Sequence, residues 1–401
     1  MSRNAPVREL VPTSVGDAHR QTTLGVVGGG QLGRMFVQAA QAMGYRTCVL
    51  DPDTHSPAGS VADVHLKAHY TDPAALEQMA QWCDAITTEF ENVPAQTLQD
   101  LARACLVAPS AQAVSVCQER AREKALFVRT GVPCVAYQEM VSEHDLKQAD
   151  PALFPAVLKT STLGYDGKGQ ASVQAWPDLA QAWEQLGRVA CVLEQRVALR
   201  AEFSVVLARD ARSHTVYLPL AQNVHRQGIL DQTTVPADDV LAQYGDQARD
   251  FAKALADSMD YVGVLCVEFF VTQDGQILAN EMAPRPHNSG HFSLDACDIS
   301  QFELQVRCLA GLPLVTPRLH SASVMINLLG DLWFPGPGGD ARTPPWAHVL
   351  QLPGVHLHLY GKQQPRVGRK MGHLTVTAAT AQEAASLSRT VRDRLGLPPT
   401  D

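Results

Sequence analysis

A short hairpin near residue 275 is the feature that most constrains how this chain can fold. The segments VLCVEFFV (264–271) and QILANE (276–281) have the composition of strands, and Asp274-Gly275 between them is a strong signal for a two-residue turn. With that turn, Val271 pairs with Leu278 and Glu268 pairs with Glu281. The two glutamates are therefore predicted to lie directly opposite each other on one face of an otherwise apolar hairpin.

Two facing carboxylates repel each other unless something lies between them. At roughly 4 Å and an effective dielectric constant near 20, the repulsion is about 4 kcal/mol. A divalent cation removes it, and a site made of oxygen ligands indicates Mg²⁺ or Mn²⁺ that also binds phosphates. Two other outcomes are a proton shared by the pair, or a turn one residue longer that separates the carboxylates.

The first part of the chain alternates strands and helices. The apolar strand LGVV (24–27) leads through the turn GGGQLG (28–33) into a helix whose apolar side chains recur every three or four residues, and two more strands follow at 46–50 and 84–93. This rhythm predicts a parallel α/β sheet, in which ligands bind beyond the carboxyl ends of the strands. The glycine turn, Asp51 and Glu89 all lie at those ends.

The glycine turn also fits the dinucleotide fingerprint G-x-G-x-x-G, with Asp51 as a candidate ribose partner. Glycines at this place let the backbone approach a ligand closely, and the N-terminus of the following helix favours an anion. A tight turn without any cofactor gives the same pattern.

Composition excludes several classes of function. The net charge of -8 argues against a general affinity for nucleic acid or anionic membranes. The nine cysteines have no C-x-x-C spacing, which favours reduced thiols in a cytoplasmic protein and no disulfide framework or zinc site. No apolar run approaches the roughly 18 residues of a membrane span. Residues 1–22 lack the apolar centre of a secretory signal, and we expect a flexible extension.

Short strands and glycine turns are expected to dominate from Pro155 to Glu281. The stretch 154–173 predicts strand, loop, strand, and Lys159 ends the first strand, where a buried ammonium group needs a partner. Its loop holds three glycines and Lys168 and is suited to cover phosphates. It is no Walker A loop, because no G-K-[ST] opens a helix, and a plain hairpin connection is the alternative.

Helices and strands of the remaining chain can be placed by their end signals. A helix from about Glu119 to Arg129 stops before Gly131, and Ser300 with Glu303 forms a capping box for another. A small closing unit is expected, with strands at 355–359 and 373–377 and a last helix capped by Thr380 and Glu383. The segment MAPRPHNSGH (282–291) places many polar donors directly after the second strand of the hairpin.

These motifs, in this order, resemble the ATP-grasp enzymes. The likeness rests on the lysine-ended strand, GYDGKGQ (164–170), EQRV (194–197), VEFFV (267–271) and NEMAPRPHNSGH (280–291). With GGGQLGRM (28–35), TTEFENV (87–93), ISQFE (299–303) and GRKMGHLTV (368–376), the chain closely resembles the 5-(carboxyamino)imidazole ribonucleotide synthases of purine biosynthesis, over about residues 24–377. HNSGH and GQLGRM are far more specific than the glycine loops.

The resemblance implies an ATP-grasp fold of mixed α/β and α+β class. The expected parts are an extension (1–22), a biotin-carboxylase-like α/β domain (23–118), the ATP-grasp domain (119–316) and a small C-terminal domain (317–401). It also implies the reaction: ATP phosphorylates bicarbonate to carboxyphosphate, and the amine of aminoimidazole ribonucleotide takes up the CO2 unit, with release of ADP and phosphate. A homodimer is expected as well.

The matched motifs imply roles for individual residues. The ATP contacts would be Arg120, Lys159, Gly164, Tyr165, Asp166, Gly167, Lys168, Gly169, Gln170, Glu194, Gln195, Arg196, Val197, Glu202, His225, Asn280 and Glu281. Within this set, residues 194–197 would hold the adenine and Glu202 the ribose. Glu268 and Glu281 would hold Mg²⁺ or Mn²⁺.

Two further groups of residues are implied around the acceptor. The residues between the γ-phosphate and the acceptor would be Arg285, His287, Asn288, Ser289 and His291, which can stabilise charge on bicarbonate and on the transferring phosphoryl group. The substrate contacts would be Gln31, Leu32, Glu89, Tyr165, Asp166, Lys362, Arg369 and Lys370, the last three for a 5′-phosphate. The chain departs from the pattern at Leu163, where many relatives have glycine, and a stiffer loop is expected.

Three other functions remain as alternatives. A formate-dependent transformylase of the same pathway would share the fold, but HNSGH and the pair Lys362 and Arg369 argue against it. A nicotinamide oxidoreductase would use the glycine turn but leaves the paired glutamates unexplained. A non-catalytic nucleotide-binding regulator would not need Arg285 and His291.

Overall fold

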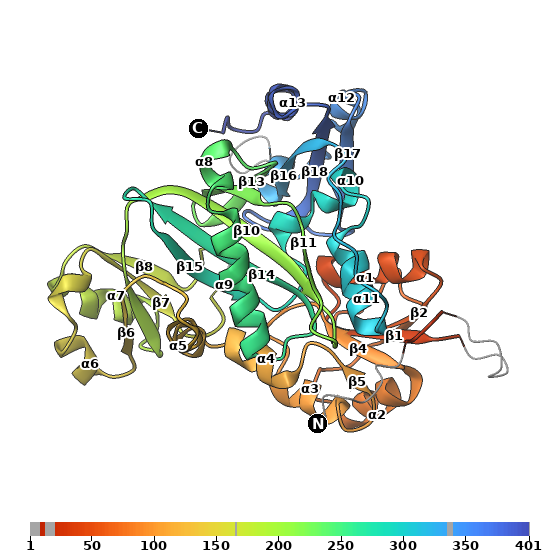
Figure 1. The fold of residues 1–401 in the computed structure, drawn as a ribbon, viewed down its shortest axis with the longest axis horizontal. Helices are drawn as coiled ribbons and strands as arrows, with labels where there is room; N and C mark the ends of the chain where they lie inside the picture. Colours follow the sequence, from red (N-terminus) through yellow and green to blue (C-terminus); the bar gives the residue numbers. More distant parts are fainter. Residues whose placement is uncertain (1–8, 13–20, 165–166, 335–339, 401) are drawn as a thin grey trace.

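The computed structural model describes residues 9–12, 21–164, 167–334 and 340–400. Tyr165 and Asp166, predicted to contact ATP and substrate, lie outside the described residues. The strands form three sheets, and Figure 1 shows a large sheet in the centre with a smaller sheet on one side and the N-terminal sheet on the other. In the part of the chain that is described, no helix combines the length and the apolar character needed to cross a membrane.

The N-terminal sheet has five parallel strands in the order β3-β2-β1-β4-β5, which confirms the predicted α/β arrangement. Its elements are β1 (Thr23–Val27), α1 (Gln31–Ala42), β2 (Arg46–Leu50), β3 (Val64–Leu66), α2 (Pro73–Trp82), β4 (Ala85–Thr88), α3 (Ala95–Leu101), β5 (Leu106–Val107) and α4 (Ala111–Cys117). Leu32, Met35 and Phe36 of α1 are buried as their spacing predicts, and pack in one cluster with Phe302 and Val306.

Part of the segment expected to be a flexible extension is packed against this domain. Leu10 is buried in the same cluster, and its backbone N–H donates to Ala310 O at 2.8 Å. The hydroxyl of Tyr45 donates to the carbonyl of Leu10 at 2.5 Å. Residues 9–12 therefore belong to the fold, because an apolar side chain and both backbone groups of Leu10 find partners there.

The smaller sheet has four antiparallel strands in the order β6-β9-β7-β8. Its elements are α5 (Arg120–Thr130), β6 (Tyr137–Met140), α6 (Glu143–Lys147), β7 (Ala156–Thr160), β8 (Gln170–Val173), α7 (Leu179–Gln185) and β9 (Cys191–Gln195). The predicted strand, loop, strand is present, with Lys159 opposite Gln170.

The large sheet has nine strands and includes the C-terminal part of the chain. Its main path is β15-β14-β10-β12-β13-β16-β18-β17, and β11 pairs with β10. The strands are β10 (Leu199–Arg209), β11 (Thr215–Tyr217), β12 (Ala221–Arg226), β13 (Ile229–Val235), β14 (Gly263–Thr272), β15 (Ile277–Ala283), β16 (Ala322–Leu329), β17 (Val355–Leu359) and β18 (Lys370–Ala378). The small closing unit thus shares a continuous sheet with the middle of the chain through β13 and β16.

Several helices cover this sheet. They are α8 (Asp239–Ala242), α9 (Gly245–Ser258), α10 (Ser293–Ala296), α11 (Gln301–Ala310), α12 (Trp346–Leu350) and α13 (Ala381–Leu395). Both predicted helix starts are confirmed, but only one capping box is complete. Thr380 and Glu383 form both of its hydrogen bonds, whereas at α11 Ser300 Oγ accepts from Glu303 N–H and the Glu303 carboxylate pairs with Arg307 instead. The expectation that strands and turns dominate residues 155–281 is wrong for α9, whose buried Ala248, Ala252 and Leu255 have helical spacing.

The hairpin of β14 and β15 reaches the predicted pairing by a different route. The turn is one residue longer than expected, since Val271 pairs with Ile277 and Thr272 N–H donates to Gln276 O. A β-bulge at Asn280 then shifts the register back, so that Glu268 pairs with Glu281 as predicted. The two deviations cancel at the position where the carboxylates are needed.

Candidate active site

One pocket of about 730 Å³ lies where the three parts of the chain meet. It receives side chains from the carboxyl ends of the N-terminal strands, from α5 and β15, and from the loop before β18. The predicted site residues that line it are Gln31, Leu32, Glu89, Arg120, Gly164, Lys168, Glu281, Arg285, His287, Asn288, His291, Lys362, Arg369 and Lys370. Residues far apart in the sequence therefore converge on one cavity.

Other predicted residues lie outside this lining. They are Lys159, Gly167, Gly169, Gln170, Glu194, Gln195, Arg196, Val197, Glu202, His225, Glu268, Asn280 and Ser289. Most belong to β7, β8 and β9 of the smaller sheet or to β10, β12 and β14 of the large sheet. An ATP molecule would have to extend from the pocket between the two sheets to meet them.

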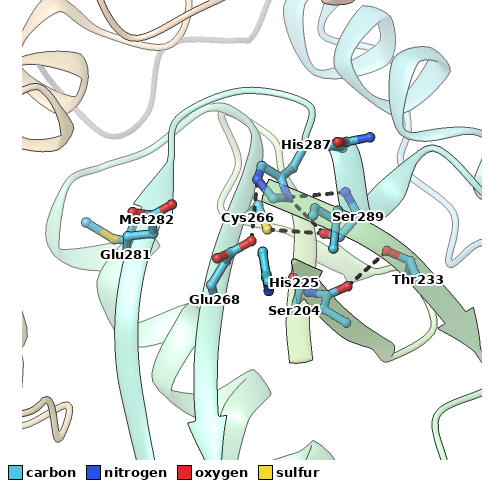
Figure 2. A network of polar contacts seen from close by, with 12 residues as sticks. Ser204, His225, Thr233, Cys266, Glu268, Glu281, Met282, His287 and Ser289 are labelled. Carbon is cyan, nitrogen blue, oxygen red and sulfur yellow. Dashed lines mark hydrogen bonds and ion pairs between the residues drawn. The ribbon is translucent and has the colours of Figure 1, made fainter. Parts of the chain in front are cut away.

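Glu268 and Glu281 have the surroundings of a cation site. Figure 2 shows Glu268 on the strand beside Glu281, with His287 and His225 next to it. Burial, together with nearby Glu281 and Glu202, raises the pKa of Glu268 to about 7, although His225 lowers it. Asn280 Oδ1, on the bulge, is buried and has no hydrogen-bond partner in the described residues. The set of two carboxylates and an amide oxygen fits Mg²⁺ or Mn²⁺.

This set is not a complete metal cage. In the part of the chain that the structure describes, no group of three or more His, Cys, Asp and Glu side chains is arranged to hold a metal ion. A site with only two carboxylates matches the way Mg²⁺ keeps waters and substrate phosphates as its remaining ligands. Glu281 Oε2 lies 3.6 Å from Arg120 Nη1, and Glu268 Oε1 lies 3.5 Å from His287 Nε2.

His225 lies close to Glu268 and Glu281 and forms an ion pair with a further glutamate, Glu202. Its Nδ1 is 2.7 Å from Glu202 Oε2. Burial lowers the pKa of His225, but Glu202, Glu268 and Glu281 outweigh it and raise the pKa to about 9. His225 therefore carries a positive charge near neutral pH and offsets part of the negative charge on this face.

Glu194 is the counter-ion of two lysines. Its Oε2 is 2.6 Å from Lys159 Nζ and its Oε1 is 3.4 Å from Lys124 Nζ, and Lys124 is fully buried. Burial opposes ionisation of Glu194, but Lys159, Lys124 and Arg120 hold its pKa at about 2. The side chain of Glu194, predicted to help hold adenine, is thus engaged inside the protein, and the backbone N–H groups of Gln195 and Arg196 donate to Ala136 O and Pro155 O.

The pKa of Lys159 is also lowered, although it pairs with Glu194. Burial is the first cause, and the nearby cations Arg120 and Lys124 act in the same direction. Both shifts have one explanation: three cations surround the ionised Glu194, of which only Arg120 has a second carboxylate, Glu281, within 4 Å among the described residues. Glu123, close by, has a pKa raised to about 8 by burial, so it compensates little. Such an excess of positive charge is suited to a triphosphate.

The HNSGH segment folds as a short 3₁₀ turn (Asn288–Gly290) between β15 and α10. Two of its members are engaged inside the protein. Ser289 is fully buried, and its Oγ lies 2.8 Å from His287 Nδ1. The Asn288 amide exchanges hydrogen bonds with Asn327 of β16. Ser289 therefore orients His287 through this hydrogen bond. The prediction that Ser289 itself lines the site is wrong, because it is not among the residues that line the pocket.

Arg285 pairs with a carboxylate to which the sequence assigned no role. Its Nε donates to Glu91 Oε2 at 2.6 Å, and Glu91 lines the pocket. Burial alone would raise the pKa of Glu91, but the attraction to Arg285 is larger and the pKa of Glu91 is lowered. The loop that carries Glu91 is fixed by Gln118, whose Nε2 donates to Glu91 O and Val93 O at 2.6 Å. Its position at the end of a predicted strand was the sequence signal that could have identified Glu91 as a site residue.

The glycine turn after β1 receives carboxylates of its own sheet. Glu89 accepts hydrogen bonds from the backbone N–H groups of Gly30 and Gly33, the latter at 2.8 Å. A Cβ on Gly30 would lie 2.5 Å from Glu89 Oε1, so any other residue there would displace the Glu89 carboxylate from these hydrogen bonds. Asp51 accepts from Gly29 N–H at 2.7 Å and from Tyr70 at 2.6 Å. These contacts explain the turn without a dinucleotide and argue against the oxidoreductase.

Basic residues of the closing unit also line the pocket. Lys362 Nζ donates to Lys370 O at 2.7 Å and lies 5.6 Å from the ring centre of Tyr360. Arg369 Nη1 donates to Gln364 O at 2.8 Å. Leu163, in the opposite loop, has φ of 61°, a left-handed conformation that glycine adopts more readily.

Comparisons with known proteins agree with this arrangement. Family models match three consecutive parts: a ribonucleotide synthetase preATP-grasp domain at residues 21–118, an ATP-grasp domain at 125–302 and a phosphoribosylaminoimidazole carboxylase C-terminal domain at 323–387. The N5-carboxyaminoimidazole ribonucleotide synthase of Brucella melitensis is 42% identical, over 88% of this chain and 96% of the relative. The same enzyme of Bacillus subtilis is 40% identical, over 88% and 90%.

Solved structures give the same result. An ADP complex of an N5-carboxyaminoimidazole ribonucleotide synthetase superposes with a TM-score of 0.86 at 37% identity, covering 96% of this chain and 98% of the other. The N5-carboxyaminoimidazole synthase of Aspergillus clavatus in complex with ADP and 5-aminoimidazole ribonucleotide has a TM-score of 0.84 at 29% identity, covering 94% and 98%.

Proposed function

The chain belongs to the N5-carboxyaminoimidazole ribonucleotide synthase family of ATP-dependent ligases in purine biosynthesis, and on this premise we propose how its residues carry out the reaction. ATP phosphorylates bicarbonate to carboxyphosphate with release of ADP. The exocyclic amine of 5-aminoimidazole ribonucleotide then bonds to the carbon of the CO2 unit, while phosphate leaves and the nitrogen loses a proton.

The observation that carries this proposal is that three groups of charged and polar side chains line one pocket. Arg120, Lys168 and Glu281 line the side next to the two sheets, and Lys362, Arg369 and Lys370 come from the closing unit. Arg285, His287 and His291 come from the segment between β15 and α11. This arrangement suits a triphosphate, a 5′-phosphate and a small carboxylate bound in the same cavity.

Individual residues act mainly by binding and orientation. Arg120 and Lys159 hold the phosphates of ATP, and the buried Lys124 adds positive charge behind them. The donors Arg285 and His287 hold bicarbonate and the charge that develops on it. Glu268, Glu281 and Asn280 would hold Mg²⁺, which when bound neutralises phosphate charge. Gln31, Leu32 and Glu89 surround the imidazole. We also propose that the protein is a homodimer and acts in the cytoplasm. Sedimentation of the purified protein tests the dimer.

The reaction is tested by ADP formation with Mg-ATP and bicarbonate, with and without 5-aminoimidazole ribonucleotide. Strong stimulation by the ribonucleotide, with ¹³C from bicarbonate in the nucleotide product, is the expected result. Stimulation by formate and glycinamide ribonucleotide instead would identify a transformylase. Nucleotide binding without ATP turnover in any of these mixtures would instead support a non-catalytic nucleotide-binding regulator.

The basic residues of the closing unit provide a more specific prediction. Arg369→Gln is expected to raise the KM for the ribonucleotide about 10- to 100-fold, because one charge-assisted phosphate contact contributes about 1.5–3 kcal/mol. The kcat and the KM for ATP should change little. Steady-state kinetics measure this, with Arg389→Gln on the exposed side of α13 as the control. An unchanged KM for the ribonucleotide would contradict a phosphate site at Arg369.

A further inference from the structure

Gln301, the first residue of α11, connects both histidines of the HNSGH segment. Its side chain is fully buried. Its Oε1 accepts a hydrogen bond from His287 N–H at 2.8 Å. Its Nε2 donates to His287 O at 2.8 Å and lies 3.0 Å from His291 Nδ1. A Cβ on Gly290 would lie 2.5 Å from Gln301 Oε1, so the glycine permits this close approach.

The orientation of the Gln301 amide follows from these partners. A backbone N–H can only donate and a carbonyl can only accept, so His287 fixes which end of the amide is oxygen and which is nitrogen. The reversed amide would place two donors against each other at His287 N–H and two acceptors at His287 O. The group facing His291 Nδ1 is therefore the NH2 group.

This orientation determines the tautomer of His291. An amide NH2 group has no acceptor, so His291 Nδ1 must accept the hydrogen bond and carry no proton. In the neutral ring the proton then sits on Nε2. His291 lines the pocket, and Nε2 is the ring nitrogen that Gln301 does not engage.

We propose that Gln301 is a positioning residue that holds His291 in the Nε2–H form, so that His291 is a fixed hydrogen-bond donor to the transferring group and not its general base. This rests on the proposed carboxylation. When the amine nitrogen bonds to carbon it must lose a proton, and a ring that already carries its proton on Nε2 cannot accept it there. That proton has to leave to another base.

The surroundings of His291 keep the ring neutral. It is enclosed by the rings of His373, Phe302 and Tyr360, with ring centres 4.8, 5.7 and 6.4 Å away. Burial is the main reason that its pKa lies well below the usual value. The charged or titratable groups that face it are His287, Arg285, Lys370, His358, His373 and Tyr360. The cations among them act in the same direction as burial.

The direct test is the tautomer of His291 in the intact ligand-free protein, read from ¹⁵N NMR of labelled histidine and assigned with His291→Gln. We expect an unprotonated Nδ1 and a protonated Nε2. A proton on Nδ1 with a bare Nε2 would overturn the proposal. Since this measurement needs no turnover, it is independent of whether the proposed reaction is correct.

A pair of variants provides a second test. His291→Gln keeps an N–H donor near the position of Nε2 but cannot act as a base, whereas His291→Phe removes the donor. We expect kcat within about 10-fold of the natural chain for the first and a loss of about 100-fold or more for the second, the usual effect of losing one donor at a site of developing charge. Equal losses in both variants, each still binding ADP, would overturn the donor role.

Gln301→Glu tests the positioning residue itself. It keeps the acceptor for His287 N–H but removes the NH2 group that donates to both His287 O and His291 Nδ1. The ionised carboxylate can only accept, so the proton of His291 is expected to move to Nδ1, with a loss of kcat of about 100-fold. The control is Gln305→Glu, one turn along α11, whose amide contacts Val264 and Thr87. An unmoved proton in Gln301→Glu would show that Gln301 does not set the tautomer.

Discussion

Glu194→Leu is expected to destabilise the folded protein by about 3–5 kcal/mol, because it leaves Lys124 buried without a carboxylate. Lys124 has no exposed side-chain surface, and Glu194 is 3% exposed. Lys124 also donates to the carbonyl of Asn280 at 3.0 Å and lies 5.6 Å from the ring centre of Phe127, but neither partner carries a negative charge. The midpoint of urea unfolding, followed by circular dichroism, measures the effect.

The double variant Lys124→Met with Glu194→Leu is the control for this interpretation. Replacing both charges with apolar groups removes the fully buried cation and leaves only Lys159, whose side chain is 15% exposed, without its carboxylate, so the double variant should recover part of the lost stability. If it is as unstable as Glu194→Leu alone, lost packing and not the buried charge explains the effect.

The same prediction has a pH dependence. The pKa of Glu194 in the folded protein is about 2, below that of an unfolded glutamate. The stability that its ionised form contributes is therefore fully present above the unfolded pKa, near 4.3, and is lost as the pH falls toward 2. The difference between natural chain and variant should be constant from pH 7 to about 5 and shrink below that. A difference that grows in acid would contradict the pairing.

Local sequence patterns predicted the elements that carry the site but not the contacts between them. The α/β rhythm, the strand that ends at Lys159 and the caps of α11 and α13 depend on neighbouring residues, and the structure confirms them. The pairs of Arg285 with Glu91 and of Lys124 with Glu194 join residues far apart in the chain. No local pattern specifies such partners, because tertiary packing decides them.

The hairpin shows how a correct pairing can rest on an incorrect turn. Asp274-Gly275 signalled a two-residue loop, but Thr272 Oγ1 hydrogen-bonds Asp274 and Gln276 N–H and extends the turn by one residue. The bulge at Asn280 restores the register and leaves Asn280 Oδ1 buried beside the two glutamates. A bulge next to an active site that re-aims side chains is a common device. The helix α9, in contrast, could have been predicted from its apolar spacing.

Glu281→Gln and Glu268→Gln are each expected to lower ADP formation about 1,000-fold or more, since each removes one of two carboxylates proposed to bind the metal that accompanies ATP. The control is Glu139→Gln, an exposed glutamate on β6. Without ligands, Glu268→Gln should not destabilise the fold above pH 7. The pKa of Glu268 is raised to about 7 by burial and by Glu281 and Glu202, so its ionised form opposes folding as the pH rises through that value.

A variant that loses activity yet unfolds at the same or higher urea concentration at pH 8 would show that the carboxylate serves catalysis at the expense of stability. A variant that keeps its activity at saturating Mg²⁺ would contradict the metal site, and loss of both activity and stability would assign Glu268 a structural role.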